Sequence, residues 1–190
     1  GNHTFTHPDL SAVTINREKL ELNATQRFVQ SILGRSLVLF RPPYCSEDSP
    51  LSLDEARVIS TASELGYRTI GLAADAKDWE LYRKDENGKE VRRTGRDLAD
   101  AILDALDDMK GSAILLHDGP ADREATVDAV DLLIPELQAR GYQIVPVSEL
   151  IGASRDEIMP EVKTSDLRIG FSSLYLSSLY IEAIFFIRSV

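Results

Sequence analysis

The sequence has little cysteine, little histidine and too few basic residues to balance its acidic ones, and each shortage excludes some chemistry. Among 190 residues there is one cysteine, Cys45, so an internal disulfide and a metal site built of several thiolates are both excluded. Lysine and arginine number 21 against 31 aspartates and glutamates, which gives a formal net charge of -10. Because nucleic-acid binding depends on basic side chains that neutralise phosphates, this balance argues against a nucleic-acid partner.

The chain also lacks an initiator methionine and a visible signal peptide. Because Gly1 stands inside a candidate functional motif, we expect the chain to be a fragment or a processed product. Its length predicts one domain with a sizeable core, and 43% hydrophobic and 27% charged residues are typical of a soluble globular protein.

Two of the three histidines stand near the beginning of the chain. His3 and His7 are separated by three residues, which allows two imidazole rings to bind one cation from a helical turn or a tight loop. Pro8 favours extended geometry for His7 and a helix start after it, so we expect the pair on a loop. The pair by itself is weak evidence, because two surface histidines show this spacing more often than a metal site does.

Alternating apolar strands and amphipathic helices predict an α/β fold with a parallel sheet buried on both faces. Helices are expected after Thr14 or Asn16, after Ser52, after Thr94 and from about Arg123, and strands at residues 37–40, 67–72, 112–116 and 143–145. About four strands are too few to close a barrel of eight, so either the sheet is open or strands are missing before Gly1.

Two finer expectations concern the surface and the core of this fold. The first helix should bury an apolar stripe at i, i+4 spacing, consisting of Leu20, Ala24, Phe28 and Ile32. The charged, glycine-containing stretch from Lys84 to Arg93 should be a solvated loop, and it is a candidate for substrate selection.

Residues with functional chemistry follow the predicted strands directly. Arg41-Pro42-Pro43-Tyr44 comes after the first strand, Asp75-Ala76-Lys77-Asp78-Trp79 after the second and His117 after the third. Parallel α/β folds and barrels build their active sites at the C-terminal ends of strands. This placement predicts that the three segments contribute to one site.

Four motifs, in this order, resemble those of the polysaccharide deacetylases, the NodB-homology family or carbohydrate esterase family 4: His3-Thr4-Phe5-Thr6-His7-Pro8, Arg41-Pro42-Pro43-Tyr44, Asp75-Ala76-Lys77-Asp78-Trp79 and Leu115-Leu116-His117. The resemblance covers roughly residues 1–150. It implies a distorted (β/α) barrel, N-terminally truncated here, over residues 1–152. It also implies removal of acetyl groups from N-acetylglucosamine units of chitin- or peptidoglycan-like glycans with a divalent metal, commonly zinc.

One family motif, an Asp-Asp pair on an upstream strand, does not occur in the printed chain. In relatives, one of these aspartates is the general base and the other binds the metal together with the two histidines. Because two protein ligands hold a catalytic metal less well than three, we expect weak metal binding and little turnover from the chain as printed.

The resemblance implies a role for each matched residue on the metal side of the site. His3 and His7 would bind the metal, which polarises the acetamide carbonyl and activates a water molecule. Arg41 would orient the missing base, and the backbone N–H of Tyr44 would stabilise the oxyanion. A plain surface arginine is the alternative for Arg41.

The same resemblance makes His117 the general acid that protonates the departing amine, with Asp78 raising its pKa. Trp79 and Leu115 would line the pocket for the acetyl methyl group. The plainer interpretations are a histidine satisfied at a strand end and two ordinary core side chains. Asp75 would either hydrogen-bond its own loop or face water.

Two other functional classes remain open. A degenerate deacetylase could bind a glycan without cleaving it, and only the missing first motif separates this non-catalytic remnant from an enzyme. An unrelated metal-dependent amidohydrolase would also use paired histidines on an α/β scaffold, but all three histidines are already assigned.

The composition changes after Gly152. Residues 153–168 are expected to be a linker, and residues 169–190 a mostly apolar tail whose length approaches that of a membrane span, although Glu182 would be costly there. The alternative is an amphipathic helix on the domain. Some relatives are fused through membrane segments to a family 2 glycosyltransferase, so the resemblance implies an extracytoplasmic or envelope location with the tail as a candidate anchor.

Overall fold

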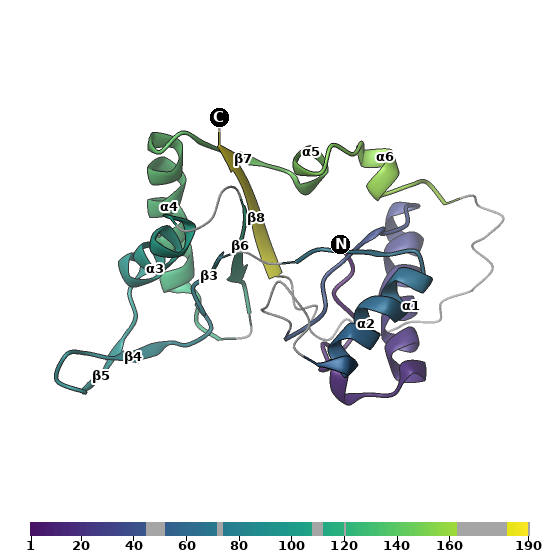
Figure 1. Ribbon diagram of the computed structural model, residues 1–190, viewed down its shortest axis with the longest axis horizontal. Helices are drawn as coiled ribbons and strands as arrows, with labels where there is room; N and C mark the ends of the chain where they lie inside the picture. Colours follow the sequence, from purple (N-terminus) through teal and green to yellow (C-terminus); the bar gives the residue numbers. More distant parts are fainter. Residues whose placement is uncertain (45–51, 72–73, 108–111, 120, 163–181, 190) are drawn as a thin grey trace. The chain divides into compact units, whose positions relative to one another are not determined.

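The computed structural model describes residues 1–44, 52–71, 74–107, 112–119, 121–162 and 182–189 (Figure 1). The chain divides into two compact units. The first unit comprises Gly1–Gly71 and Gly152–Leu179, and the second unit comprises Leu72–Ile151 and Tyr180–Val190. Each unit has a hydrophobic core of its own.

The first unit contains helices and a short parallel sheet. Its elements are η1 (Leu10–Ala12), α1 (Ile15–Leu33), β1 (Leu39–Phe40), α2 (Leu53–Glu64), β2 (Arg68–Thr69) and α6 (Arg155–Ile158). Strand β1 pairs in parallel with β2, and Asn2 forms a parallel bridge to Phe40. Along β1 and its flanking residues, the backbone hydrogen bonds alternate between Asn2 on one side and the β2 segment on the other. Strand β1 therefore lies between Asn2 and β2. The segments that follow Asn2 and β1, which begin with His3 and Arg41, therefore leave the sheet at the same end.

Threonine and serine side chains begin three of the helices, as the sequence predicts. Thr14 accepts the backbone N–H of Arg17, Ser52 that of Glu55 and Thr94 that of Asp97. Such caps satisfy N–H groups that have no partner inside the helix, so their sequence signal is local.

Helix α1 buries a partly polar face, and the predicted apolar stripe is wrong at Leu20 and Ile32, while Ala24 and Phe28 are half-buried. Leu20 and Ile32 are 58% and 63% exposed, whereas Glu18 is fully buried. The Glu18 carboxylate lies 2.7 Å from the guanidinium of Arg57 on α2. Arg57 also donates to the carbonyl oxygen of Leu10 at 2.9 Å. Apolar spacing selected the wrong face because the partner that makes a buried glutamate tolerable comes from another helix.

Residues 154–162, which the sequence suggests are part of a linker, pack on the first unit. Arg35 donates to the carbonyl oxygen of Met159 at 2.6 Å and forms an ion pair with Asp156 at 2.7 Å. The backbone N–H of Val38 donates to the carbonyl oxygen of Ile158 at 3.0 Å. The predicted linker thus begins as an ordered segment.

The second unit is built on a four-stranded sheet in the order β3-β6-β8-β7. Its elements are β3 (Ala74–Asp75), β4 (Tyr82–Lys84), β5 (Glu90–Arg92), α3 (Gly95–Asp107), β6 (Ser112–His117), α4 (Glu124–Ala139), β7 (Tyr142–Val145), α5 (Val147–Leu150) and β8 (Glu182–Ser189). Strands β3 and β6 are parallel, but β8 is antiparallel to both β6 and β7. The α/β class is confirmed, whereas the expectation of an entirely parallel sheet is wrong. Pairing between such distant segments leaves no signal in local sequence patterns.

Helices α3 and α4 lie side by side and pack on the sheet (Figure 1). The buried cluster consists of Ala74, Ala76, Leu98, Ala99, Ile102, Leu103, Leu106, Ile114, Leu116, Ala129, Leu133 and Leu137. It contains Leu98, Ile102 and Leu106, which lie at i, i+4 spacing along one face of α3. Alternation along β6 places Leu115 and His117 on the sheet face opposite these helices.

Within the stretch from Lys84 to Arg93, Lys84 and Glu90–Arg92 belong to the strands of the β4–β5 hairpin, so the predicted loop is wrong there, whereas residues 85–89 form the solvated turn between the strands. Asp85 sets its turn by accepting the backbone N–H groups of Asn87 and Lys89, both at 2.9 Å. Gly88 supplies the positive φ of 77°. The sequence does not indicate these strands, because almost all of their side chains are polar and exposed and the apolar alternation of a strand is therefore missing.

The predicted tail is described only in part. Residues 182–189 form strand β8, while residues 169–181 and 190 lie outside the described residues. Among the residues that the structure describes, no helix is both long and apolar enough to cross a membrane.

We predict that Gly95→Ala destabilises the second unit. A Cβ at this position would lie 2.5 Å from the Cβ of Asp128 and 2.8 Å from the backbone nitrogen of Ala129, so α3 and α4 would have to separate. Overpacking of this kind costs about 1–3 kcal/mol, measurable by urea denaturation. Gly119→Ala is the control, because an added Cβ there meets nothing within 4 Å. Equal stability of the two variants would contradict the close approach.

Candidate functional site

His3 and His7 lie against each other at the end of the first-unit sheet. Their ring centroids are 4.8 Å apart with an interplanar angle of 69°. His3 Nδ1 lies 2.8 Å from the carbonyl oxygen of Arg41. Since a carbonyl oxygen only accepts hydrogen bonds, Nδ1 carries the proton, and a neutral ring then has its lone pair on Nε2. This is the tautomer in which an imidazole can bind a metal through Nε2.

The loop that carries the pair has a constrained backbone. Thr4 and His7 have φ angles of 67° and 56°, a region that non-glycine residues seldom adopt. The extended geometry expected for His7 is therefore wrong. The loop's own hydrogen bonds account for the difference, because Thr4 Oγ1 accepts the His7 N–H at 3.1 Å and Asn2 Oδ1 accepts the Thr4 N–H at 3.0 Å.

Glu21 on α1 holds the middle of the same loop. It is 2% exposed, and its carboxylate accepts the N–H groups of Phe5 and Thr6 at 2.9 and 2.7 Å and the Thr6 hydroxyl at 2.6 Å. Arg17 adds an ion pair at 2.6 Å. Burial would raise the pKa of the Glu21 carboxyl, but the bonds from Thr6 and Phe5, with the charge of Arg17, outweigh it and hold that pKa below its usual range.

Neither Glu21 nor Asn2 was found from the sequence. A glutamate within an amphipathic helix is normally solvated, and its burial follows only from the contact with a loop that precedes the helix. Asn2 is 1% exposed and donates to the carbonyl oxygen of Leu22 at 2.9 Å. Its position beside His3 was the one available signal.

Arg41 and Tyr44 complete the first group. Arg41 is 6% exposed, which excludes the surface-arginine alternative. Tyr44 has a φ of 60° and a ring 70% exposed that meets His7 edge to face, with 5.0 Å between centroids. The first unit thus brings His3, His7, Arg41 and Tyr44 together.

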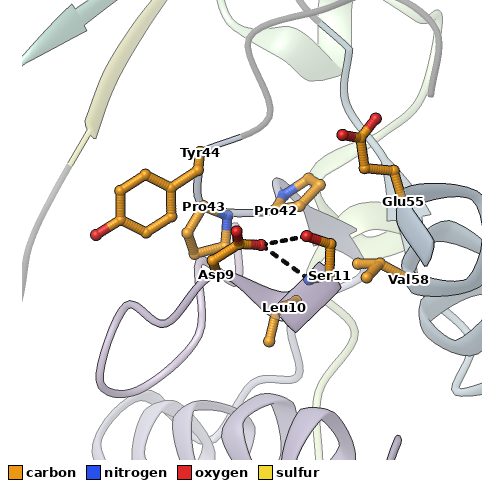
Figure 2. A pocket seen from close by; sticks show the side chains of 8 residues that line it. All are labelled: Asp9, Leu10, Ser11, Pro42, Pro43, Tyr44, Glu55 and Val58. Carbon is orange, nitrogen blue, oxygen red and sulfur yellow. Dashed lines mark hydrogen bonds between the residues drawn. The ribbon is translucent and has the colours of Figure 1, made fainter. Parts of the chain in front are cut away.

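A pocket adjoins this group (Figure 2). It encloses about 390 Å³, part of it open to solvent, and is lined by Asp9, Leu10, Ser11, Pro42, Pro43, Tyr44, Glu55 and Val58. Figure 2 shows Asp9 bonded to Ser11, whose N–H and hydroxyl it accepts at 2.9 and 2.6 Å. Oxygen atoms beside proline and tyrosine rings suit a ligand that is polar at its edges and apolar on its faces.

The donor set fits a divalent metal in part. Two imidazoles, one of them oriented by a carbonyl group, correspond to two of the three protein ligands of a catalytic zinc site. Within the ranges that the structure describes, no group of three or more His, Cys, Asp or Glu side chains could hold a metal.

The second unit joins Asp78 and His117. His117 Nδ1 lies 2.6 Å from Asp78 Oδ1, and the His117 backbone N–H donates to Oδ2 at 2.9 Å. Asp78 is 3% exposed. Burial would raise the pKa of its carboxyl, but the hydrogen bonds from His117 and Thr126 outweigh it and hold that pKa below its usual range.

Two residues at the start of α4 complete this arrangement and were not found from the sequence. Thr126 donates its hydroxyl proton to Asp78 Oδ2 at 2.8 Å. Arg123 donates to the carbonyl oxygens of Asp78 and Gly119, both at 3.0 Å. Both residues lie more than 40 positions after Asp78, and helix-start patterns say nothing about such contacts.

The remaining predicted residues lie in the same unit. Asp75 accepts the N–H of Lys77 at 2.7 Å, so it hydrogen-bonds its own loop, one of the two expected alternatives. Trp79 is 50% exposed and is therefore not a core side chain. Leu115 is buried, as an ordinary core side chain would be, and it lies on the same face of β6 as His117.

Comparison with known proteins identifies the family of the chain. The family model described as polysaccharide deacetylase matches residues 1–70. The chitooligosaccharide deacetylase of Azorhizobium caulinodans is 30% identical over 160 residues, which cover 77% of this chain and 66% of that protein. The chain belongs to the polysaccharide deacetylase family. A second relative, the peptidoglycan-N-acetylglucosamine deacetylase of Bacillus cereus, is 32% identical over 157 residues, covering 80% of this chain and 62% of that protein.

A solved structure of the same family confirms the predicted fold class. The chitin deacetylase of Colletotrichum lindemuthianum superimposes with a TM-score of 0.62 at 24% identity, covering 84% of this chain and 64% of that one. This likeness supports the fold of a distorted (β/α) barrel, part of which is present here. The chain spans less than two thirds of the length of these polysaccharide deacetylases.

We predict that Glu21→Gln loosens the histidine loop. A neutral amide forms weaker bonds to the loop than a carboxylate, so unfolding free energy should fall by about 1–2 kcal/mol and zinc affinity, measured by calorimetry, by about tenfold. The folded-state pKa of Glu21 lies below its ordinary value of 4.5, so the stability difference is full above pH 4.5 and closes as the pH falls through the folded-state pKa.

The control for this variant is Glu64→Gln, an exposed glutamate at the end of α2. It should change neither stability nor zinc affinity. A Glu21→Gln protein that matches this control at pH 7 would show that the loop does not depend on the buried charge.

Proposed function

We propose that the protein is a metal-dependent polysaccharide N-deacetylase. Its substrate would be a chitin- or peptidoglycan-like glycan, from whose N-acetylglucosamine units it releases acetate. The observation that carries this proposal is the contact of buried Asp78 with half-buried His117, 2.6 Å apart, in a family member that also places two imidazole ring centroids 4.8 Å apart. Both relatives compared above carry deacetylase names.

His3 and His7 would hold the divalent cation, and zinc is the metal we propose because it is commonly bound by imidazole ligands, with cobalt as a substitute. The family resemblance adds an aspartate from a motif upstream of His3 as the third ligand. When bound, the cation supplies polarisation of the acetamide carbonyl and a water of lowered pKa.

The residues of this chain would handle the proton and the oxyanion. Asp78 fixes the Nδ1–H of His117, so the opposite nitrogen, Nε2, can deliver a proton to the amide nitrogen as its C–N bond breaks. The amine leaves with that proton, and the acetyl group leaves as acetate with the oxygen of water. The backbone N–H of Tyr44 would donate to the oxyanion, and Arg41 would orient the base.

Two further features support a glycan substrate. The pocket beside Tyr44 combines carboxylates and a hydroxyl with flat apolar rings, the surface that a sugar ring complements. The net charge of -10 does not oppose an uncharged glycan. Substrate selection by the β4–β5 hairpin stays a prediction.

We expect the full-length protein, loaded with zinc or cobalt, to release acetate from N-acetylglucosamine oligomers. Removing the metal or replacing His3 by alanine should abolish release, and His117→Asn should lower kcat by about 10²–10⁴-fold, as loss of a general acid does. The control Glu64→Gln should release acetate with the same kcat as the unchanged protein. A folded, metal-loaded protein that releases no acetate would contradict the proposed enzymatic activity. Glycan binding without cleavage would then support the non-catalytic alternative.

We also propose that the protein is located in the cell envelope and that residues 169–190 associate with a membrane. A glycosyltransferase fused to the chain is a further proposal. We expect the full chain to sediment with membranes and a chain that ends at Arg168 to stay soluble. The alternative outcome follows from β8: if residues 182–189 remain in the sheet, both proteins stay soluble and the shorter one is less stable. Fractionation and urea denaturation separate these outcomes.

A further inference from the structure

The carboxylate of Asp78 is held by donors from two different elements. Oδ1 faces His117 Nδ1 at 2.6 Å, and Oδ2 accepts both the His117 backbone N–H at 2.9 Å and the Thr126 hydroxyl at 2.8 Å. His117 ends β6, whereas Thr126 is the third residue of α4. The bonds to His117 connect Asp78 only to the end of β6. The bond from Thr126 connects it to helix α4 as well.

Helix α4 is a rigid support for this contact. Thr126 is 7% exposed, and Ala129, Leu133 and Leu137 of the same helix belong to the buried core. A threonine side chain is restricted at χ1, so its hydroxyl loses little freedom when it binds the carboxylate. The first turn of a helix also favours a negative charge, which adds to the stabilisation of ionised Asp78.

Arg123, the residue before α4, fixes the backbone on both sides of the pair. Its two terminal nitrogens donate to the carbonyl oxygens of Asp78 and Gly119, each at 3.0 Å. The loop after β3 and the loop after β6 are thereby tied to one guanidinium. Among the described residues, the charged side chains that contact Asp78 are His117 at the end of β6 and Arg123 at the start of α4.

We propose that Thr126 is a positioning residue that acts on the general acid His117 through Asp78. The catalytic part of this inference, that His117 is a general acid, rests on the proposed deacetylase function. Thr126 prevents the carboxylate from rotating away from the imidazole and, as a hydrogen-bond donor, moderates its basicity. Without the hydroxyl, Asp78 attracts the imidazolium form of His117 more strongly and holds the ring less accurately.

The test compares Thr126→Val with Thr126→Ser in the full-length protein. In the valine variant, the NMR titration midpoint of the His117 ring should rise by about half a pH unit, part of the effect of one neutral hydrogen bond. We expect kcat for acetate release to fall about tenfold with KM unchanged, similar to the loss of a partner that orients a ligand. Thr126→Ser keeps the hydroxyl and should restore both values.

Thr25→Val is the matched control, because Thr25 is a buried helical threonine whose hydroxyl has no hydrogen-bond partner among the described residues. It should leave the His117 midpoint and kcat unchanged. An unmoved or lowered midpoint in Thr126→Val would reduce Thr126 to a structural role and overturn the proposal. If the unchanged protein releases no acetate but the midpoint still rises, the positioning stands and the deacetylase function fails.

Discussion

In each of the two units, the candidate functional residues depend on a buried carboxylate that accepts hydrogen bonds from the loops around it. Glu21 does this in the first unit, where it binds the loop between His3 and His7. Asp78 does it in the second unit, where it binds both the backbone and the ring of His117. Removing a carboxylate from water is costly, and several donors to its charged form offset that cost. Each carboxylate therefore fixes the positions of the groups that donate to it, and these groups in turn fix the carboxylate.

This interaction explains how unfavourable backbone geometry persists beside the functional side chains. In the part of the chain that the structure describes, positive φ angles outside glycine occur at Thr4, His7, Tyr44 and Lys77. All four lie within the segments that match the family motifs. Such conformations survive only where surrounding bonds impose them, and here Asn2, Glu21 and Asp75 accept N–H groups of the first and last of these loops. The strained loops hold the candidate side chains where a relaxed loop would not place them.

Much of this organisation could be predicted, because its signals are local. The α/β class, the caps at Thr14, Ser52 and Thr94, and the strand that ends on His117 depend on residues close together in sequence. The pairing of Asp78 with His117 was expected from the resemblance, and the structure places them together. Leu20 and Ile32 show the limit of local patterns: their spacing is that of a buried face, yet the helix buries Glu18 and Glu21.

The sequence by itself determined which residues can carry the chemistry, where the helices begin and that the polar segments follow strands. Tertiary structure alone decided that Glu21 binds the loop between the two histidines, that Thr126 binds Asp78, that Arg123 joins two loops and that β8 runs antiparallel between β6 and β7. The physical reason is the range of the interactions. Caps and apolar periodicity act within a few residues, whereas a buried charge becomes favourable only when donors distant in sequence reach it.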